Sequence, residues 1–348
     1  MRLFSFFPAL FVLPFTTECA VSSPLSPILA VTLSRMGNTR IKAVVKNTGR
    51  QDISFVHLNF FGNSAPVKKV SIFRENEEIE FEGVIVRFRT DGLTNESVTS
   101  LPAGGTLEDE FDLASTSDLT AGGPILIHSE GTVPVVTNGN VTGYIAYQSN
   151  TLQFEVNGLE AERVSRTLPS NRQRRDFRCS SQTKDILARA ISTASGLASK
   201  AAAAIESGDD LRFKEFFQAT DRQQRMTVSD RFRAVANEAS GGGLVTYHCS
   251  DPYGICGPDL VAYARGYLNE IITCDRFYSQ YPLLTRECDS VDQATTVLHE
   301  LTHVAAVYNP ATRDLAYGYD AATQLSAREA RDNADNYAFY SLAVELQC

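Results

Sequence analysis

The sequence has no tryptophan, only three methionines and only five histidines among its 348 residues. It also lacks a basic excess, because 32 Lys and Arg stand against 41 Asp and Glu and give a formal net charge of −9. Nucleic-acid binders and proteins of anionic membrane surfaces carry a basic footprint, so both classes are disfavoured. No two cysteines have the C-x2-C spacing, which argues against a cysteine-based zinc site.

Long apolar runs are also lacking, apart from a short one at the N-terminus. Arg2 precedes an apolar stretch over residues 3–15, and the polar residues 16–18 end it. A transmembrane helix needs about 20 apolar residues, whereas a signal peptide needs fewer and is followed by small residues such as Cys19 and Ala20. We therefore predict a signal peptide over residues 1–19 and a secreted, extracellular protein without a membrane anchor.

Apart from Cys19, the cysteines are confined to the second half of the chain. They are Cys179, Cys249, Cys256, Cys274, Cys288 and Cys348. An even number in an exported chain suggests three disulfide bonds, although six cysteines allow 15 pairings.

The sequence changes character near residue 176. Before it, strand-like runs such as 41–45, 70–73, 84–88 and 152–156 alternate with Gly- and Asn-containing turns, which favours an antiparallel β-sandwich. Two sequons begin at Asn95 and Asn140 and could carry N-linked glycans. The basic stretch that ends in Arg174-Arg175 predicts an exposed linker, which a processing protease of dibasic specificity could cut.

Downstream of the linker, the pattern becomes helical. We expect helices over about 183–205, 211–219, 227–239, 291–308 and 326–346, with short strands at 244–249 and 271–274. The fold class predicted for the whole chain is therefore α+β, with a β-rich region over residues 20–175 and a mainly helical domain with a small sheet over residues 176–348.

The most informative motif is His299-Glu300-Leu301-Thr302-His303. On a helix that Ser290 and Gln293 could cap, residues i and i+4 share one face, so both imidazoles can reach one metal ion. Zinc suits two histidines and an oxygen ligand. Glu300 projects beside them, where it would contact a metal-bound water. The motif predicts a zinc-dependent peptidase.

A catalytic zinc needs a third protein ligand. A metzincin would have histidine at position 309, where this chain has asparagine, and His248 lies far upstream on a predicted strand. An acidic ligand is therefore expected. The candidates are Asp314, Asp320, Glu329 and Asp335, and Glu329 would be the thermolysin-like solution. Asp335 could instead accept a hydrogen bond from a ligand histidine and fix its tautomer, or it could be an ordinary helix carboxylate.

The motif and the later segment Thr312-Arg313-Asp314-Leu315-Ala316-Tyr317-Gly318 together resemble the deuterolysin family of aspzincin metalloendopeptidases. The resemblance implies that Asp314 is the third zinc ligand, that Tyr317 stabilises the transition state and that residues 20–175 are a propeptide. It also implies the pairs Cys179–Cys249 and Cys256–Cys274, which leaves Cys288 for Cys348. Ala311 departs from the glycine that the family usually has there.

The predicted mechanism assigns one role to each site residue. Zinc lowers the pKa of its bound water to about 7, and Glu300 takes the proton and passes it to the leaving amine. Zinc and the Tyr317 hydroxyl stabilise the oxyanion. Two rival hypotheses are a secreted binding protein with a structural zinc and a zinc hydrolase of non-peptide substrates.

The expected partners are protein and peptide substrates, a dibasic processing protease and the chain's own propeptide, as inhibitor or folding aid. Residues 176–348 carry 16 Lys and Arg against 23 Asp and Glu, a net charge of −7. This charge and the family resemblance both suggest basic substrates such as histones and protamines. We expect a monomer, with no nucleic-acid or membrane partner. Inhibition is expected from the shape of the propeptide rather than from His57 or His128.

Overall fold

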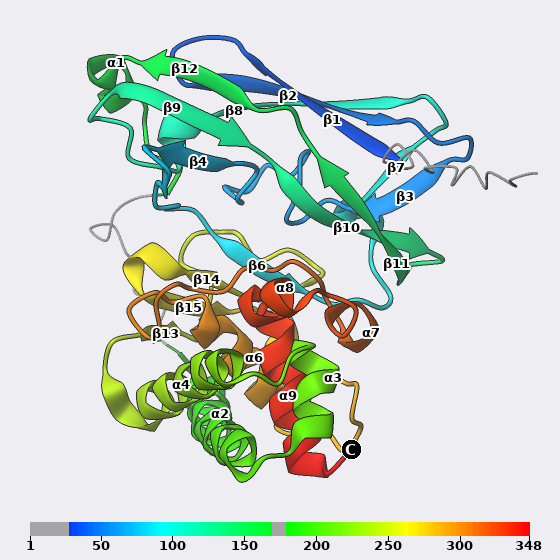
Figure 1. Cartoon of the computed structure of the whole chain (residues 1–348), viewed down its shortest axis with the longest axis vertical. Helices are drawn as coiled ribbons and strands as arrows, with labels where there is room; N and C mark the ends of the chain where they lie inside the picture. The colour runs from blue at the N-terminus through cyan, green and yellow to red at the C-terminus, as the bar shows by residue number, and fades with distance from the viewer. Residues whose placement is uncertain (1–27, 169–178) are drawn as a thin grey trace, which may run out of the picture.

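The computed structural model describes residues 28–168 and 179–348, so the predicted signal peptide and the Arg174-Arg175 pair lie outside the described residues. We call residues 28–168 the N-terminal part and residues 179–348 the C-terminal part. The molecule is a mixed α/β fold. The N-terminal part forms the upper half of Figure 1, and most helices lie in the lower half.

The N-terminal part is built from antiparallel strands in three sheets, of order β1-β2-β8, β11-β10-β3-β7 and β12-β9-β4-β5. Its strands are β1 (Leu29–Arg35), β2 (Arg40–Asn47), β3 (Ile53–Val56), β4 (Ser71–Arg74), β5 (Glu77–Glu78), β6 (Ile85–Phe88), β7 (Val98–Leu101), β8 (Thr106–Asp112), β9 (Gly123–His128), β10 (Glu130–Thr137), β11 (Asn140–Gln148) and β12 (Leu152–Val156). A short helix, α1 (Gly158–Glu162), follows them.

One hydrophobic core joins these three sheets. In β1, Leu29, Val31 and Leu33 are buried, while the residues between them are more exposed, as expected for a strand with one face in a core. The core continues with side chains such as Phe55 of β3 and Ile127 of β9. The strand-and-turn pattern of the sequence therefore does correspond to a layered β structure.

The C-terminal part contains most of the helices. They are α2 (Ser181–Ser207), α3 (Asp210–Phe217), α4 (Arg222–Asn237), α5 (Asp275–Ser279), α6 (Gln293–Thr302), α7 (Tyr319–Ala322), α8 (Ala327–Asp332) and α9 (Ala334–Leu346). The long helix α2 begins after the N-cap Ser180 and ends at Gly208, whose φ of 85° suits glycine. It packs against α4, α6 and α9, so the helix with the histidine motif is held inside a helical core.

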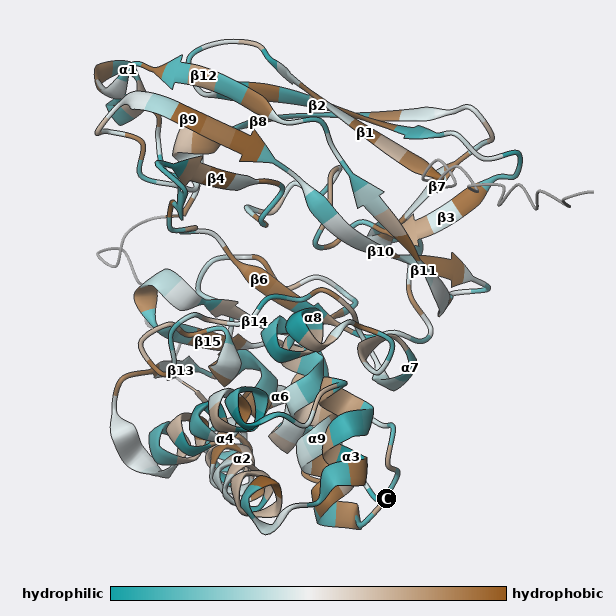
Figure 2. Ribbon diagram, viewed as in Figure 1, coloured by the Kyte–Doolittle hydropathy of each residue, from teal (hydrophilic) through white to brown (hydrophobic). Residues whose placement is uncertain are grey.

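A second core element is a four-stranded sheet that contains strands from both parts of the chain. Its order is β13 (Thr246–His248), β15 (Glu270–Thr273), β14 (Leu260–Arg265) and β6. Strand β6 pairs antiparallel with β14, and Figure 1 shows it lying between the N-terminal sheets and the helices. Most of β6 is hydrophobic (Figure 2), so its sequence does not distinguish it from the strands of the N-terminal sheets.

Three predicted helices differ from those observed. The helix expected over 227–239 begins five residues earlier, at Arg222, and ends at Asn237. The helix expected over 291–308 covers only Gln293–Thr302, and its N-cap is Asp292, with Thr295 completing the capping box, rather than Ser290 with Gln293. It ends early because the Thr302 carbonyl accepts from the N–H of Thr312 at 2.9 Å, which brings the chain back toward the helix.

The helix expected over 326–346 is broken at Asn333, which has extended backbone angles. Arg313 pairs with the backbone on both sides of this break. The Arg313 N–H donates to the Asp332 carbonyl at 2.7 Å, and the Arg313 carbonyl accepts from the N–H of Ala334 at 3.0 Å. Asn333 also accepts from the N–H groups of Leu315 and Ala316 at 2.8 and 3.1 Å. The break therefore holds the segment that contains Asp314.

The structure confirms the three disulfide bonds Cys179–Cys249, Cys256–Cys274 and Cys288–Cys348. The last of these ties the end of α9 to the segment that precedes α6. Within residues 28–168 and 179–348, no helix has the length and apolarity of a membrane span. Both sequon asparagines, Asn95 and Asn140, are exposed, and the side chain of Asn140 accepts from the N–H of Gly92 at 2.9 Å.

Candidate metal centre

Helix α6 carries the histidine motif on a rigid, buried support. The Asp292 carboxylate accepts from the N–H of Thr295 at 2.7 Å, satisfying a backbone donor at the start of the helix. Val297, Leu298 and Leu301 have no exposed surface. Burial on this scale fixes the direction in which the polar side chains project from the helix.

The structure brings together His299, His303 and Asp314, three of the predicted site residues. The Nε2 atoms of His299 and His303 each lie 3.2 Å from Oδ1 of Asp314, and the two nitrogens are 3.2 Å apart. All the candidate ligand atoms lie within 4.8 Å of one another. Two of these candidate ligands come from α6 and its C-terminal end, and the third comes from the returning loop.

The far ring nitrogens of both histidines have hydrogen-bond acceptors. Nδ1 of His299 lies 2.8 Å from Oδ1 of Asp335, and Nδ1 of His303 lies 3.0 Å from the Thr312 carbonyl. An imidazole that donates from Nδ1 keeps the lone pair of Nε2 free. The expectation that Asp335 holds a ligand histidine therefore agrees with this contact.

A zinc ion fits this arrangement. Two nitrogen lone pairs and one carboxylate oxygen converge, and no hydrogen-bond donor among the described residues reaches Oδ1 of Asp314. Three acceptors this close repel one another unless a cation lies between them. Although burial alone would raise it, the pKa of Asp314 is held well below its usual range by the two neighbouring imidazoles, so this carboxylate is ionised. Two imidazoles and one carboxylate match the ligand set of catalytic zinc.

Glu300 is also buried, but its carboxyl group has no hydrogen-bond partner among the described residues. Its side chain has no exposed surface. Burial raises its pKa to about 8, against the opposing charge of His303. A carboxyl with a pKa near neutrality is suited to accept a proton and release it again.

Tyr317 contacts the other carboxylate oxygen of Asp314. Its hydroxyl donates to Oδ2 of Asp314 at 3.0 Å, and the ring is buried. Burial and, as a smaller cause, the negative charge of Asp314 raise the pKa of Tyr317 well above its usual value. The hydroxyl therefore keeps its proton and can donate a hydrogen bond near the candidate metal centre.

The other candidates are held elsewhere. Glu329 is exposed and caps its own helix, accepting from the N–H of Ser326 at 2.9 Å. Asp320 is exposed on α7. His248 lies on strand β13, as expected, with Nε2 3.4 Å from Glu270. The structure does not bring Glu329, the thermolysin-like candidate, to the two histidines, because that carboxylate caps its own helix.

Residues of the N-terminal part that no sequence motif indicated also contact this centre. Nη1 of Arg87 in β6 lies 2.5 Å from Oδ1 of Asp335, and both side chains are 3% exposed. Burial opposes ionisation of Asp335, but Arg87 and His299 together bring its pKa down to about 2. The side-chain amide of Asn59 donates to the Tyr317 hydroxyl. In the sequence, the one sign that β6 contacts a polar site is the charged residue Arg87 within the otherwise apolar run 84–88.

Two further contacts join the N-terminal part to the loop of Asp314. Thr132 of β10 donates to the Leu315 carbonyl, and Tyr144 of β11 donates to the Tyr317 carbonyl. By contrast, His57 contacts Thr99 and His128 stacks on Phe73, so neither histidine takes part in the metal centre.

Comparison with known proteins agrees with this geometry. The model of the deuterolysin metalloprotease (M35) family matches residues 1–348. Neutral protease 2 of Aspergillus oryzae is 53% identical, with 100% of both chains aligned. Penicillolysin of Penicillium citrinum is 48% identical over 94% of each chain, and a neutral protease 2 homolog of Aspergillus terreus is 48% identical over 93% of each. The chain belongs to the deuterolysin metalloprotease family and is a metalloendopeptidase.

Proposed function

We propose that the chain is the secreted precursor of a zinc endopeptidase with His299, His303 and Asp314 as the metal ligands. The observation that carries this proposal is the convergence of their three ligand atoms beside the unpartnered, buried carboxyl of Glu300. The predicted signal peptide and the three disulfide bonds support export to an oxidising compartment.

In the proposed mechanism, a zinc ion held by these ligands supplies Lewis acidity and makes water a nucleophile at neutral pH. Glu300 takes a proton from the attacking water and gives it to the nitrogen of the leaving amine. The Tyr317 hydroxyl donates to the oxygen of the scissile carbonyl as its negative charge develops. Asp335 fixes the ring of His299 through Nδ1.

We also propose that the N-terminal part is an inhibitory propeptide, released by cleavage after Arg175. Its strand β6 lies along β14, and its side chains contact Tyr317 and Asp335. A substrate could not reach Glu300, which has no exposed surface while the two parts are together. Removal of residues 28–168 would leave this edge of β14 without its partner strand.

A preference for basic protein substrates, such as histones and protamines, is the third element of the proposal. Residues 176–348 carry a net charge of −7, which favours cationic partners. The pairing of Arg87 with the buried Asp335 supports the same preference, because a basic side chain is already accommodated beside the metal centre.

Metal removal tests the proposed function. Processed protein treated with a chelator is expected to lose casein hydrolysis, because the ligands and Glu300 alone do not activate water. One equivalent of zinc should restore the activity, measured as the release of acid-soluble peptides. Full activity in protein shown to be metal-free would contradict the proposal. Bound zinc without hydrolysis of casein or protamine would favour a binding protein with a structural metal.

A further inference from the structure

We propose that strand β6 occupies the place of a substrate, with the Val86–Arg87 peptide bond at the reaction centre, and that Asn59 prevents its cleavage. This inference rests on the proposed function and assigns a regulatory role to two residues of the N-terminal part. It follows from the pairing of β6, from the contacts of Val86 and from those of Arg87.

The pairing of β6 is that of an extended peptide added to a sheet edge. Among the described strands, β14 has β15 on one side and β6 on the other. Val86 lies opposite Tyr263 and Arg87 opposite Ala262 in an antiparallel register. Without β6, the backbone groups of β14 on this side would be unpaired. An edge strand in that state can bind another extended peptide.

The contacts of Val86 place its carbonyl near the candidate oxyanion stabiliser. Asn59, in the turn after β3, donates from its side-chain amide to the Val86 carbonyl at 2.8 Å. The same amide nitrogen donates to the Tyr317 hydroxyl, which in turn donates to the metal-ligand candidate Asp314. The carbonyl of Val86 and the hydroxyl of Tyr317 therefore share one amide group.

Arg87 anchors the other side of the same peptide bond. Its guanidinium lies 2.5 Å from Asp335, whose carboxylate also contacts the ligand His299 at 2.8 Å. The next residue, Phe88, packs against Tyr317 with ring centroids 4.3 Å apart. The Val86–Arg87 peptide is thus linked through Asn59 to Tyr317 and through the Arg87 side chain to Asp335. These two residues contact the metal-ligand candidates Asp314 and His299.

Asn59 also explains why this bond remains intact. Its side chain binds Val86 on both backbone groups, since its Oδ1 accepts from the Val86 N–H at 3.3 Å. The Tyr317 hydroxyl, whose hydrogen bond a reacting carbonyl would need, accepts from the Asn59 amide and donates to Asp314 at 3.0 Å rather than to Val86. The Val86 carbonyl therefore accepts from Asn59 instead of from Tyr317, and the two bonds to Asn59 restrain its movement toward a tetrahedral geometry.

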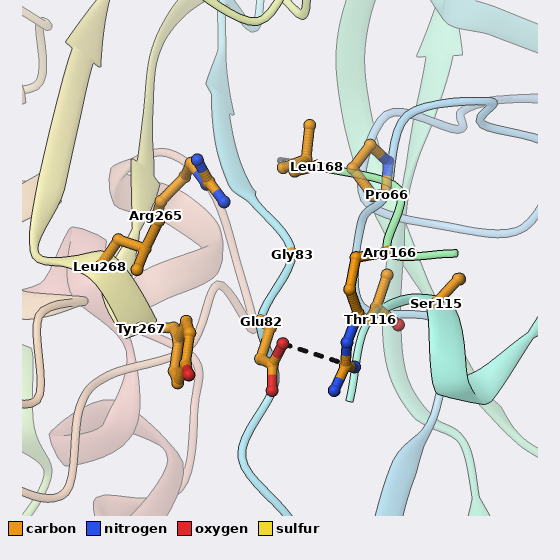
Figure 3. Close-up of a pocket in the computed structure, with 10 residues that line it drawn as sticks. All are labelled: Pro66, Glu82, Gly83, Ser115, Thr116, Arg166, Leu168, Arg265, Tyr267 and Leu268. Carbon is orange, nitrogen blue, oxygen red and sulfur yellow. Dashed lines mark ion pairs between the residues drawn. The ribbon is translucent and has the colours of Figure 1, made fainter. Parts of the chain in front are cut away.

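The ends of β6 are fixed as well. At Gly83 there is no room for a side chain, because a Cβ would lie 2.1 Å from the Pro66 carbonyl. Beside it, Glu82 pairs with Arg166 at 3.4 Å across a small pocket that Tyr267 of the C-terminal part also lines (Figure 3). At the other end, the N–H of Arg89 donates to the Asp259 carbonyl at 3.0 Å. A strand fixed at both ends would keep cleaved ends in place.

The inference predicts that the same strand is a substrate once Asn59 is absent. A synthetic peptide of residues 82–91, blocked at both ends, is expected to be hydrolysed by the processed enzyme between Val86 and Arg87. One water is consumed, the amide C–N bond breaks, and a Val86 carboxylate and an Arg87 amine are formed. Mass spectrometry of the products identifies the bond.

Two variant peptides form a matched pair. Arg87→Glu is expected to slow cleavage at this bond by on the order of tenfold or more, because it places a like charge beside Asp335. Arg89→Glu makes the same change of charge two residues away and should have a much smaller effect. Equal slowing by both would mean that net charge alone matters, which would overturn the role given to Arg87.

The full-length chain provides a second test. With Arg174→Gln and Arg175→Gln to block processing, the zinc-loaded Asn59→Ala variant is expected to acquire a new N-terminus at Arg87. Adding Glu300→Gln should abolish this cut, because the cleavage is the chain's own. If the Asn59→Ala variant is not secreted, the site at which the processed enzyme cuts the 82–91 peptide tests the proposal by itself.

An enzyme that digests casein but leaves the 82–91 peptide intact, or cuts it at another bond, would overturn the inference while leaving the proposed function standing. A processed protein that digests neither casein nor the peptide would overturn the proposed function itself. The two failures are therefore distinguishable in one set of reactions.

Discussion

The Glu300→Gln variant of the processed enzyme is expected to lose roughly 100- to 10,000-fold in kcat, the range typical of a lost general base. Glutamine has nearly the same shape but cannot take a proton from water. In the wild type, the Glu300 carboxyl is buried, has a pKa raised to about 8 and has no hydrogen-bond partner among the described residues. Its function therefore does not depend on a structural contact that the variant would break.

The zinc content of Glu300→Gln should remain at one ion per chain, because Glu300 is not among the three converging ligands. Initial rates of peptide hydrolysis and metal analysis on the same preparation test both statements. Glu329→Gln is the matched control, since that carboxylate is exposed and caps its own helix, and it should leave kcat nearly unchanged. Activity near the wild-type level in pure Glu300→Gln protein would remove Glu300 from the mechanism.

The Asp314→Ala variant is expected to lose zinc and activity together. Loss of an outer-shell partner of a metal ligand typically costs about 10- to 100-fold in affinity, and loss of a ligand should cost more. Oδ1 of Asp314 lies 3.2 Å from the Nε2 atoms of both His299 and His303, so alanine leaves only two ligands. Titration of the apo-protein with zinc measures the change in affinity.

Asp320→Ala is the control for Asp314→Ala, because Asp320 lies only six residues further along the chain and is exposed on α7. It should bind zinc like the wild type. An Asp314→Ala variant that kept both zinc and activity would show that the third ligand is another residue. Asp335, whose carboxylate already contacts His299, would then be tested next.

The parts of the site that follow from local sequence could be predicted. Two histidines at i and i+4 around a glutamate must share one helix face, and helix α6 presents them in this way. The layered strands before residue 168 and the long helix α2 also follow from periodicity, which is a local property. The resemblance to deuterolysins supplied Asp314, which spacing alone left as one of four acidic candidates.

The parts that depend on tertiary contacts could not be predicted. Helix α6 ends at Thr302 because the Thr302 carbonyl accepts a hydrogen bond from the N–H of Thr312. The helix predicted over 326–346 is divided because the Asn333 side chain binds the N–H of Leu315. Nothing in the apolar run 84–88 indicates that it pairs with β14, about 175 residues away in sequence. Asn59 likewise has no sequence feature that links it to Tyr317.

The central claim is that the N-terminal part closes a functional peptidase centre until the chain is cut. The most direct test compares casein hydrolysis by two zinc-loaded forms: the uncut chain with Arg174→Gln and Arg175→Gln, and the wild-type chain cut after Arg175. We predict background activity for the uncut chain and full activity for the cut one, with equal zinc content. An uncut chain as active as the cut one would contradict the claim.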